Sequence, residues 1–253
     1  MRILLPPSET KRDGGADAPL ALDALSFPTL SGSREQTIAA LGALSTDGDA
    51  MMRALKLGPR QVPEVERNRR LAVAPTMAAI DRYTGVLFDA LDAPSLDAAA
   101  RRFAGRTVVV HSALLGLVGA LDPIPAYRLS HDSKLPGLRL KSHWRSPIAE
   151  VLDSESGLIV DLRSEGYAEL GPAPVRPGSV YVRVVSLDGA GRKRALNHFN
   201  KQAKGRFTRA VLEGRPELES IDDLLGWADS AGFSMHLGED RGEALPREIE
   251  LVA

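Results

Sequence analysis

Positively charged side chains gather in one segment late in the sequence. Residues 189–212 contain no acid, although the whole chain has 32 lysines and arginines, 33 acids and a net charge of -1. Placed on a helix at about 100° per residue, residues 194–211 separate an apolar face from a basic face. Like charges on one face cost stability unless an anion neutralises them. The segment therefore predicts an anion site, with a solvated surface helix as the alternative. The candidate residues in it are Lys201, Lys204, Gly205 and Arg209.

A second basic segment, residues 126–145, has a single acid, Asp132. Its Pro-Gly pair and short apolar spacing favour loop and turn over regular helix, and loops often carry binding sites. Tyr127 and Trp144 lie among the charges, which suits a base, a nucleotide or a sugar. The alternative is that both rings anchor the loop to the core. The candidates for anion binding here are Tyr127, Arg128, Lys134 and Lys141.

A third candidate segment is the loop "PPSETK" that follows the first apolar run of the chain. Ser8, Thr10 and Lys11 come directly after a predicted strand, which is the usual place of a ligand crevice in an α/β sheet. The loop has no glycine-rich phosphate pattern, so the signal is weak alone. Ser8 and Lys11 are nevertheless candidates for DNA or anion binding.

The elements that must position these residues are spread along the chain. Strands are predicted at 2–5, 106–112, 157–162, 179–187, 233–237 and 247–252. Helices are predicted at 47–57, 63–73, 76–91, about 194–213 and 219–230. Strands near both ends favour one sheet that both ends join, and their spacing is too irregular for a doubly wound fold. We expect an α+β fold with a mixed sheet flanked by helices, as a single domain over residues 1–253.

Composition excludes several kinds of chemistry. The chain has no cysteine, so it has no disulfide, thiolate metal site or cysteine nucleophile. Its five histidines show no metal-binding spacing, so we expect neither a metal site nor a cofactor. No apolar run is long enough to cross a membrane and the N-terminus is no signal peptide, so we expect a cytoplasmic protein without a membrane partner. The oligomeric state is left open.

Three stretches of the sequence resemble the YaaA family of bacterial peroxide stress proteins. They are "ILLPPSETK", "SALLGLVGALDPIPAYRLSHDSKL" and "NKQAKGRFTRAVL". Two shorter stretches, "LKSHW" and "DLRSEGY", also match family motifs. The polar and glycine positions that match are Ser112, Gly116, Asp122, Tyr127, Arg128, Lys134, Ser164, Tyr167, Lys201, Gly205 and Arg209. These matches run in order along nearly the whole chain.

Some family positions differ in this sequence. The family's motif tyrosine is Leu115, its proline before Tyr-Arg is Ala126, and its motif glutamate is Gly166. Many relatives have lysine where Glu9 stands, and Lys11 is the nearest replacement. The chain therefore looks like a divergent branch.

The resemblance implies a cytosolic protein linked to oxidative stress and lower free iron. It also implies a fold of the family's own type and DNA binding through a positively charged cleft, with a helix-hairpin-helix element. In this sequence the element would be residues 74–92, with Tyr83-Thr84-Gly85 as the turn. An ordinary αα-hairpin in the core is the alternative. Without cysteine, protecting DNA or acting on a metabolite is a more plausible role than removing peroxide.

We expect DNA binding, mostly sequence-independent and steeply salt-dependent, with phosphates held by the basic candidates above and Arg206. The alternative is an enzyme acting on a phosphorylated or nucleotide-like small molecule. Hydroxyls and an acid match the family beside the cations, as a shaped pocket requires. Arg128 and Arg209 would clamp an anion, and Lys201 or Lys11 would act as acid or base. This alternative predicts a closed pocket of roughly a few hundred cubic ångströms around Arg128, Lys201 and Tyr127.

Overall fold

A mixed sheet forms the centre of the molecule in the computed structural model, which describes residues 1–16, 18–187, 193–194, 197–239, 242 and 245–252. The strands follow the order β4-β3-β1-β6-β7-β10-β9, and β8 pairs with β7. Their bounds are β1 Arg2–Leu5, β3 Val108–Ser112, β4 Gly116–Gly119, β6 Ile159–Asp161, β7 Ser179–Leu187, β8 Lys193–Arg194, β9 Met235–Leu237 and β10 Arg247–Val252. A separate pair consists of β2 Thr76–Ala78 and β5 Pro123–Pro125.

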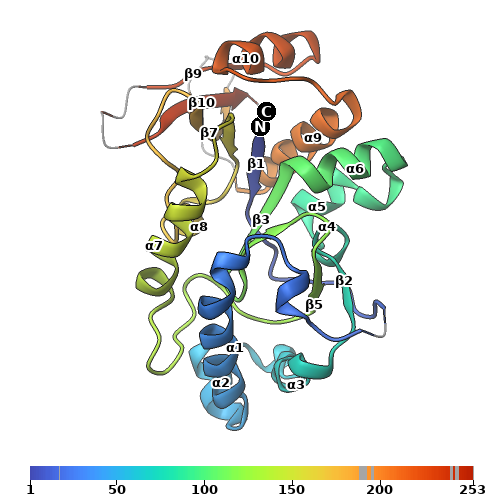
Figure 1. Ribbon diagram of the computed structural model, residues 1–253, viewed down its shortest axis with the longest axis vertical. Helices are drawn as coiled ribbons and strands as arrows, with labels where there is room; N and C mark the ends of the chain where they lie inside the picture. The colour runs from blue at the N-terminus through green and yellow to red at the C-terminus, as the bar shows by residue number, and fades with distance from the viewer. Residues whose placement is uncertain (17, 188–192, 195–196, 240–241, 243–244, 253) are drawn as a thin grey trace.

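Helices cover both faces of this sheet, as expected from the sequence (Figure 1). In that view α5, α6 and α9 lie on the right of the sheet and α7 and α8 on the left, while α1, α2 and α3 form the lower end. The helix bounds are α1 Ser31–Ser45, α2 Gly48–Ala54, α3 Pro63–Arg69, α4 Ala79–Arg82, α5 Val86–Leu91, α6 Ala98–Thr107, α7 Leu140–Asp153, α8 Glu165–Ala168, α9 Asn197–Gly214 and α10 Ile221–Ser230.

The middle of the sheet is parallel, and its short strands are buried on both faces. β1 pairs in parallel with β3 and with β6, β6 with β7, and β7 with β10. Short runs such as Val108-Val109-Val110 and Ile3-Leu4-Leu5 are apolar throughout and fully or almost fully buried. Such uninterrupted apolar runs are typical of parallel strands that have helices on both sides.

The order of the strands defines where a ligand crevice is expected. The chain leaves β1, adds β3 on one side of it, and then returns to add β6 on the other side. The carboxyl ends of β1 and β6 therefore flank a topological switch point, where the loops diverge to opposite faces. The loop that begins at Pro6 and the segment that begins at Leu162 leave the sheet there.

Gly205 allows α9 to pack directly on α5. A Cβ at this position would lie 2.2 Å from the carbonyl oxygen of Leu87 and 2.8 Å from Cβ of Ala90. The glycine thus allows the close approach of another backbone. Its contact places the middle of α9 directly against α5.

Gly205→Ala is expected to lower the free energy of unfolding by about 1–3 kcal/mol, because overpacking forces the two helices apart. The matched control is Gly226→Ala on α10, where an added Cβ meets no atom within 4 Å. That control is expected to stabilise by about 0.5–1 kcal/mol, through the higher helix propensity of alanine. Urea titrations measure both. Equal effects of the two substitutions would contradict the packing role of Gly205.

Three element predictions are wrong in part. The predicted helix 76–91 is a strand, a single helical turn and a short helix, because residues 76–78 pair with β5. The segment 126–145, predicted as loop, enters α7 at Leu140. The predicted helix at about 194–213 begins at Asn197, and Arg194 lies in β8 instead.

Candidate functional site

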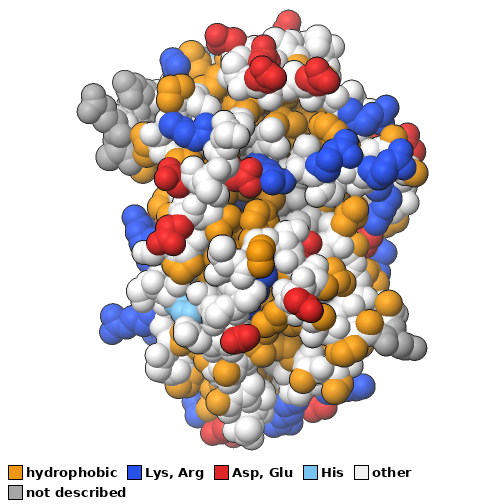
Figure 2. Space-filling model, in the orientation of Figure 1, with side chains coloured by type: hydrophobic (Ala, Val, Ile, Leu, Met, Phe, Trp, Pro, Cys, Tyr) orange, Lys and Arg blue, Asp and Glu red, His pale blue; other side chains and the backbone are white. Residues whose placement is uncertain are grey.

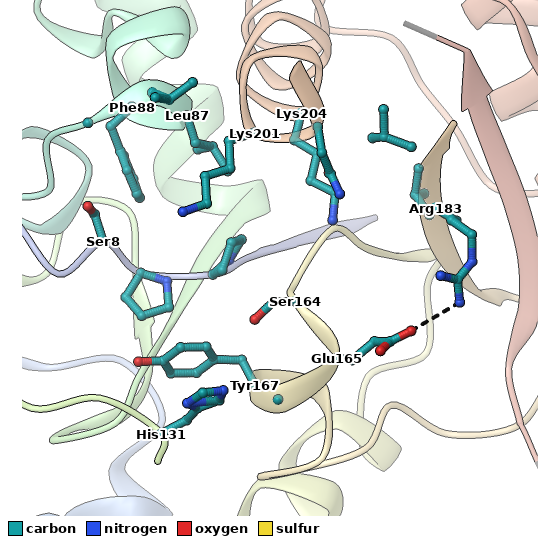
Figure 3. Close-up of a pocket in the computed structure, with 18 of the residues that line it drawn as sticks. Ser8, Leu87, Phe88, His131, Ser164, Glu165, Tyr167, Arg183, Lys201 and Lys204 are labelled. Carbon is teal, nitrogen blue, oxygen red and sulfur yellow. Dashed lines mark hydrogen bonds and ion pairs between the residues drawn. The ribbon is translucent and has the colours of Figure 1, made fainter. Parts of the chain in front are cut away.

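A crevice of about 1280 Å³ opens at the carboxyl ends of the parallel strands (Figure 3). Its walls come from the loop after β1, the turn before α5, residues 129–131, the segment after β6, β7 and the first turns of α9. This is the switch point that the strand order defines. The charged side chains in the lining are Arg183, Lys201, Lys204, Glu9, Glu165, Glu239, Glu248 and Glu250.

Two lysines of α9 point into this crevice from one face of the helix, because they are three residues apart (Figure 3). Lys204 is 5% exposed, and its Nζ donates a hydrogen bond to the carbonyl oxygen of Arg163 at 3.3 Å. Burial lowers the pKa of Lys204 to about 8. Lys201 is exposed to the crevice, and no ion pair ties it to any residue that the structure describes.

A buried polar network lies beneath Lys204. Arg163 is fully buried and forms a two-pronged ion pair with Asp161, with nitrogen–oxygen distances of 2.9 and 2.6 Å. The same guanidinium donates to Nδ1 of His111 at 2.9 Å and to the carbonyl oxygen of Gly171 at 2.9 Å. Burial and the charge of Arg163 hold the pKa of His111 well below its ordinary value. The network fixes the backbone of residue 163, which is the acceptor for Lys204.

Lys11 lies behind the wall formed by residues 8–10. Its Nζ donates to the carbonyl oxygen of Ser8 at 3.0 Å and lies 4.0 Å from the ring centroid of Tyr127. Burial first, and then the positive charge of Arg128, lowers the pKa of Lys11 to about 7. Arg128 itself is paired with Glu9 at 2.7 Å. Lys11 and Arg128 therefore brace the loop from behind.

The low pKa of Lys11 predicts how the free energy of unfolding depends on pH. Its pKa is about 7 in the folded protein, against an ordinary value of 10.5, so above pH 7 the unfolded chain binds the additional proton. The free energy of unfolding of the native protein, relative to Lys11→Met, should rise between pH 7 and pH 10 and stay level below pH 6. Urea titrations across this range measure the difference. A difference that does not vary with pH would contradict the low pKa.

A chain of hydroxyl groups continues inward from Lys11. Ser112 Oγ accepts hydrogen bonds from the N–H groups of Leu114 and Leu115 at 3.1 and 2.9 Å. Because both lone pairs of its oxygen are then used, Ser112 donates to the hydroxyl of Tyr127 at 2.7 Å, and Tyr127 donates to Tyr83 at 2.8 Å. Burial raises the pKa of Tyr127 to about 12, so these phenols stay neutral.

Gly166 leaves room for the ring of His131. A Cβ at residue 166 would lie 1.9 Å from Nε2 of His131, so the imidazole occupies the space that a side chain there would need. It stacks on the ring of Tyr167 with the centroids 5.0 Å apart and the planes at 14°.

The candidate residues from the sequence fall into three groups. Those in the crevice lining are Ser8, Lys201 and Lys204. Those behind its walls are Lys11, Ser112, Tyr127 and Arg128, all buried. Those elsewhere are Lys134, Lys141, Gly205 and Arg209. Lys134 and Lys141 are exposed, and Lys141 is paired with Glu169 at 2.6 Å.

Arg209 connects helices rather than facing the crevice. Its guanidinium donates to the carbonyl oxygens of Leu91 and Asp92 at 3.0 and 3.1 Å and pairs with Glu213 at 2.8 Å. Carbonyl oxygens at a helix C-terminus lack intrahelical partners, so this arginine satisfies the end of α5. Arg192 and the side chains of Lys193, Arg194 and His198 lie outside the described residues.

Charges of both signs surround the crevice. Three cations and five carboxylates contribute to the lining. In Figure 2, acidic and basic side chains lie beside one another around the middle of the visible face. Arg183 is held by Glu165 at 3.1 Å and by Glu248 at 3.0 Å, so its charge is shared within the wall. An uninterrupted basic surface is therefore not what these residues form.

The most important residues that sequence reasoning missed are Asp161, Arg163, His111 and His131. A signal existed for two of them. In "LIVDLR" an acid and an arginine end a buried apolar strand, and charged residues are almost never fully buried unless they are paired. The pairing with His111 joins residues far apart in the sequence, so no local pattern reveals it.

Comparison with known protein families shows which family the chain belongs to. A sequence model described as peroxide stress protein YaaA matches residues 1–237. The chain belongs to the YaaA family. A protein of Corynebacterium efficiens named UPF0246 is 44% identical over 250 residues, covering 97% of this chain and 98% of that protein. Another UPF0246 protein, from Streptomyces coelicolor, is 43% identical over 238 residues, covering 88% and 90%.

One more distant relative has the same name. A UPF0246 protein of Idiomarina loihiensis is 27% identical over 222 residues, covering 84% of this chain and 80% of its own length.

The described part of the chain contains no helix with the length and hydrophobicity of a membrane span. In that same part of the chain no three histidine, aspartate or glutamate residues come together as a metal site would require.

Proposed function

We propose that the crevice of this YaaA-family protein is the active site of an enzyme that acts on a phosphorylated or nucleotide-like small molecule. One observation carries the proposal. Lys204 is buried in the crevice wall, with a carbonyl oxygen as its hydrogen-bond acceptor and a pKa of about 8. A lysine that is partly neutral near physiological pH is suited to proton transfer.

Lys201 supplies a second, different function in this proposal. Its ammonium extends into the crevice from the preceding turn of α9 (Figure 3), and the same lining contains the hydroxyl groups of Ser8, Thr10 and Ser164. An ammonium group and several hydroxyls are ordinary ligands for a phosphate or carboxylate. Lys201 would thus hold the anion while Lys204 exchanges the proton.

The mixed charge of the lining supports a small molecule over a nucleic acid. A duplex needs phosphate contacts from many cations, whereas five carboxylates line this crevice. The predicted closed pocket is wrong in part: the crevice, at about 1280 Å³, exceeds the range of about 300–1,000 Å³ of ordinary ligand sites, and of Arg128, Lys201 and Tyr127 it is lined by Lys201 alone. This volume leaves room for a substrate together with water or a second reactant.

A panel of phosphates and nucleotides tests the proposal through thermal unfolding. A ligand at 100 times its Kd stabilises by about 2.7 kcal/mol, which corresponds to a rise of several degrees for a domain of this size. At least one compound should raise the melting temperature of the native protein and of Lys134→Ala, but not that of Lys201→Ala. If no compound shifts the native protein, the proposal is wrong.

DNA binding is the second candidate, because the turn 83–85 joins α4 and α5 at the rim of the crevice, where Thr84 and Gly85 line it. A helix-hairpin-helix turn holds phosphate with backbone N–H groups. Here the N–H of Gly85 donates to the carboxylate of Asp89 at 3.1 Å, and α4 has only four residues. Asp89 would therefore have to leave before a phosphate could bind.

A salt titration of duplex DNA binding tests this second candidate. DNA binding through the crevice predicts that the logarithm of the affinity falls linearly with the logarithm of salt concentration, by about 0.9 per phosphate neutralised. It also predicts weaker binding by Lys201→Ala. An affinity that ignores salt, or is unchanged in this variant, would exclude DNA from the crevice.

A further inference from the structure

The crevice has two chemically different halves. One half carries most of the charge, with Arg183, Glu165 and Glu248 paired along β7, α8 and β10. The other half is a slot with mainly apolar walls. The residues that line the slot are Pro6, Pro7, Leu87, Phe88, Leu129 and Tyr167. A ligand that fits both halves must therefore have an apolar part and a charged part.

The floor of the slot is the flat ring of Tyr167. His131 supports this ring from one side as a near-parallel stack, and the edge of the fully buried His111 ring meets it at 68° with the centroids 5.5 Å apart. His131 in turn lies against the backbone of Gly166, where no side chain fits. The ring of Tyr167 is thus fixed on one side. The residue is 8% exposed, and it lines the crevice.

The polar groups at the slot indicate where the charge of a ligand lies. Lys201 extends over the slot opposite Tyr167 (Figure 3), and Lys204 lies at the border with the charged half. Asn200 precedes Lys201 in the lining, and its buried side-chain oxygen has no hydrogen-bond partner among the described residues. Carboxylates line the far half, so an anion is favoured beside the two lysines rather than beyond them.

We propose that the slot takes a planar aromatic ring, stacked on Tyr167, of a ligand whose anionic group binds Lys201, on the side of the slot where Lys204 lies. This inference rests on the proposed function and names the substrate class for it. A flat, rigid ring in a slot with apolar walls selects planar groups, because every aromatic ligand presents a face that can stack. A nucleotide and an aromatic carboxylate share this chemistry.

Calorimetric titration of the full-length protein with three probes tests the inference. Adenosine monophosphate has both the ring and the anion, ribose 5-phosphate has the anion alone, and 1-naphthoate has a ring with a carboxylate. Stacking on one aromatic side chain corresponds to roughly ten-fold or more in affinity. Adenosine monophosphate or 1-naphthoate should therefore bind at least ten times more tightly than ribose 5-phosphate. Tighter binding of adenosine monophosphate would identify a nucleotide as the ligand, and tighter binding of 1-naphthoate would identify an aromatic carboxylate.

Variants locate the ring. Tyr167→Phe keeps the flat face and should keep the preference over ribose 5-phosphate, whereas Tyr167→Leu should reduce it at least ten-fold. Since Tyr167 is buried, Tyr167→Leu has a second measurement beside it. The chain has four tyrosines, and in tyrosine-labelled native protein the ring protons of the bound probe should show nuclear Overhauser contacts to Tyr167.

The outcomes separate this inference from the proposed function. If neither ring-bearing probe binds at least ten times more tightly than ribose 5-phosphate, or if no ring contact to Tyr167 is seen, the ring site is wrong while the small-molecule crevice stands. If none of the probes binds and the phosphate and nucleotide panel also leaves the melting temperature unchanged, both are wrong.

Discussion

Arg163→Met is expected to lower the free energy of unfolding by about 3–5 kcal/mol, because it leaves the carboxylate of Asp161 buried without its partner. Asp161 is 2% exposed and Arg163 is fully buried, so water cannot replace the lost ion pair. The substitution also removes the guanidinium that donates hydrogen bonds to Nδ1 of His111 and to the carbonyl oxygen of Gly171. Urea titrations at pH 7, with the m-value checked for constancy, measure the change.

A double-mutant cycle shows that the cost comes from an orphaned charge. Asp161→Leu/Arg163→Met removes both charges, and replacement of a buried pair by apolar groups is often nearly neutral. The double variant should therefore be more stable than Arg163→Met alone. The matched exposed pair is Lys141 and Glu169, both 60% exposed, for which Lys141→Met should cost at most about 1 kcal/mol. A cost this small for Arg163→Met would contradict the role of the network.

Lys204→Met is expected to lower turnover of the substrate by about 10²- to 10⁴-fold, the usual contribution of a positioned acid or base. Methionine has a similar length and suits a buried site, so the fold should persist. Binding of the substrate should change less than turnover, because in the proposal Lys201 holds the anion. Steady-state kinetics of the native protein and both lysine variants separate kcat from KM.

The pH dependence of turnover shows whether Lys204 accepts or donates the proton. Burial lowers the pKa of Lys204 to about 8. If the neutral amine accepts a proton from the substrate, kcat should rise with pH through about 8, and if the ammonium donates one, kcat should fall there. Lys204→Met should show neither change. A native profile that stays level between pH 7 and pH 9 would exclude Lys204 from the proton transfer.

The sheet could be predicted from the sequence because its buried strands are dense apolar runs. The strands at 179–187 and 247–252 agree with β7 and β10, and 2–5 agrees with β1. β4 was missed, since its sequence Gly-Leu-Val-Gly has a glycine at each end. Glycine is disfavoured in strands and usually marks turns.

Helix α7 shows why turn-forming residues alone mislead the prediction of secondary structure. Pro136 and Gly137 indicate a turn, and they do precede the helix rather than lie in it. The helical face appears only when the apolar residues are followed past residue 145. The buried positions of α7 are Leu140, Trp144, Ile148 and Leu152, spaced four residues apart. Trp144 is a core residue whose indole donates to the carbonyl oxygen of Ala113 at 2.9 Å.

The candidate site could be predicted only where charge and position in the sequence agree. Lys201, Lys204 and Ser8 reach the crevice, the first two from the basic face of a helix and the third from the end of a strand. Arg209 shares the same helix, but packing of α9 on α5 directs it to the carbonyl oxygens of Leu91 and Asp92. Helix packing determines which basic side chain faces a ligand, and a local sequence pattern does not predict how the helices pack.

The most direct test of the crevice as a small-anion site is a ¹³C NMR titration of the lysine side chains with and without adenosine monophosphate. The lysines of the chain are Lys11, Lys56, Lys134, Lys141, Lys193, Lys201 and Lys204. We predict that Lys204 titrates near its pKa of about 8 and that the nucleotide raises this pKa. The nucleotide should also move the NMR signal of Lys201, and it should leave the signals of Lys56, Lys134 and Lys141 in place. An ordinary pKa for Lys204, with no response of either crevice lysine to the nucleotide, would contradict this prediction.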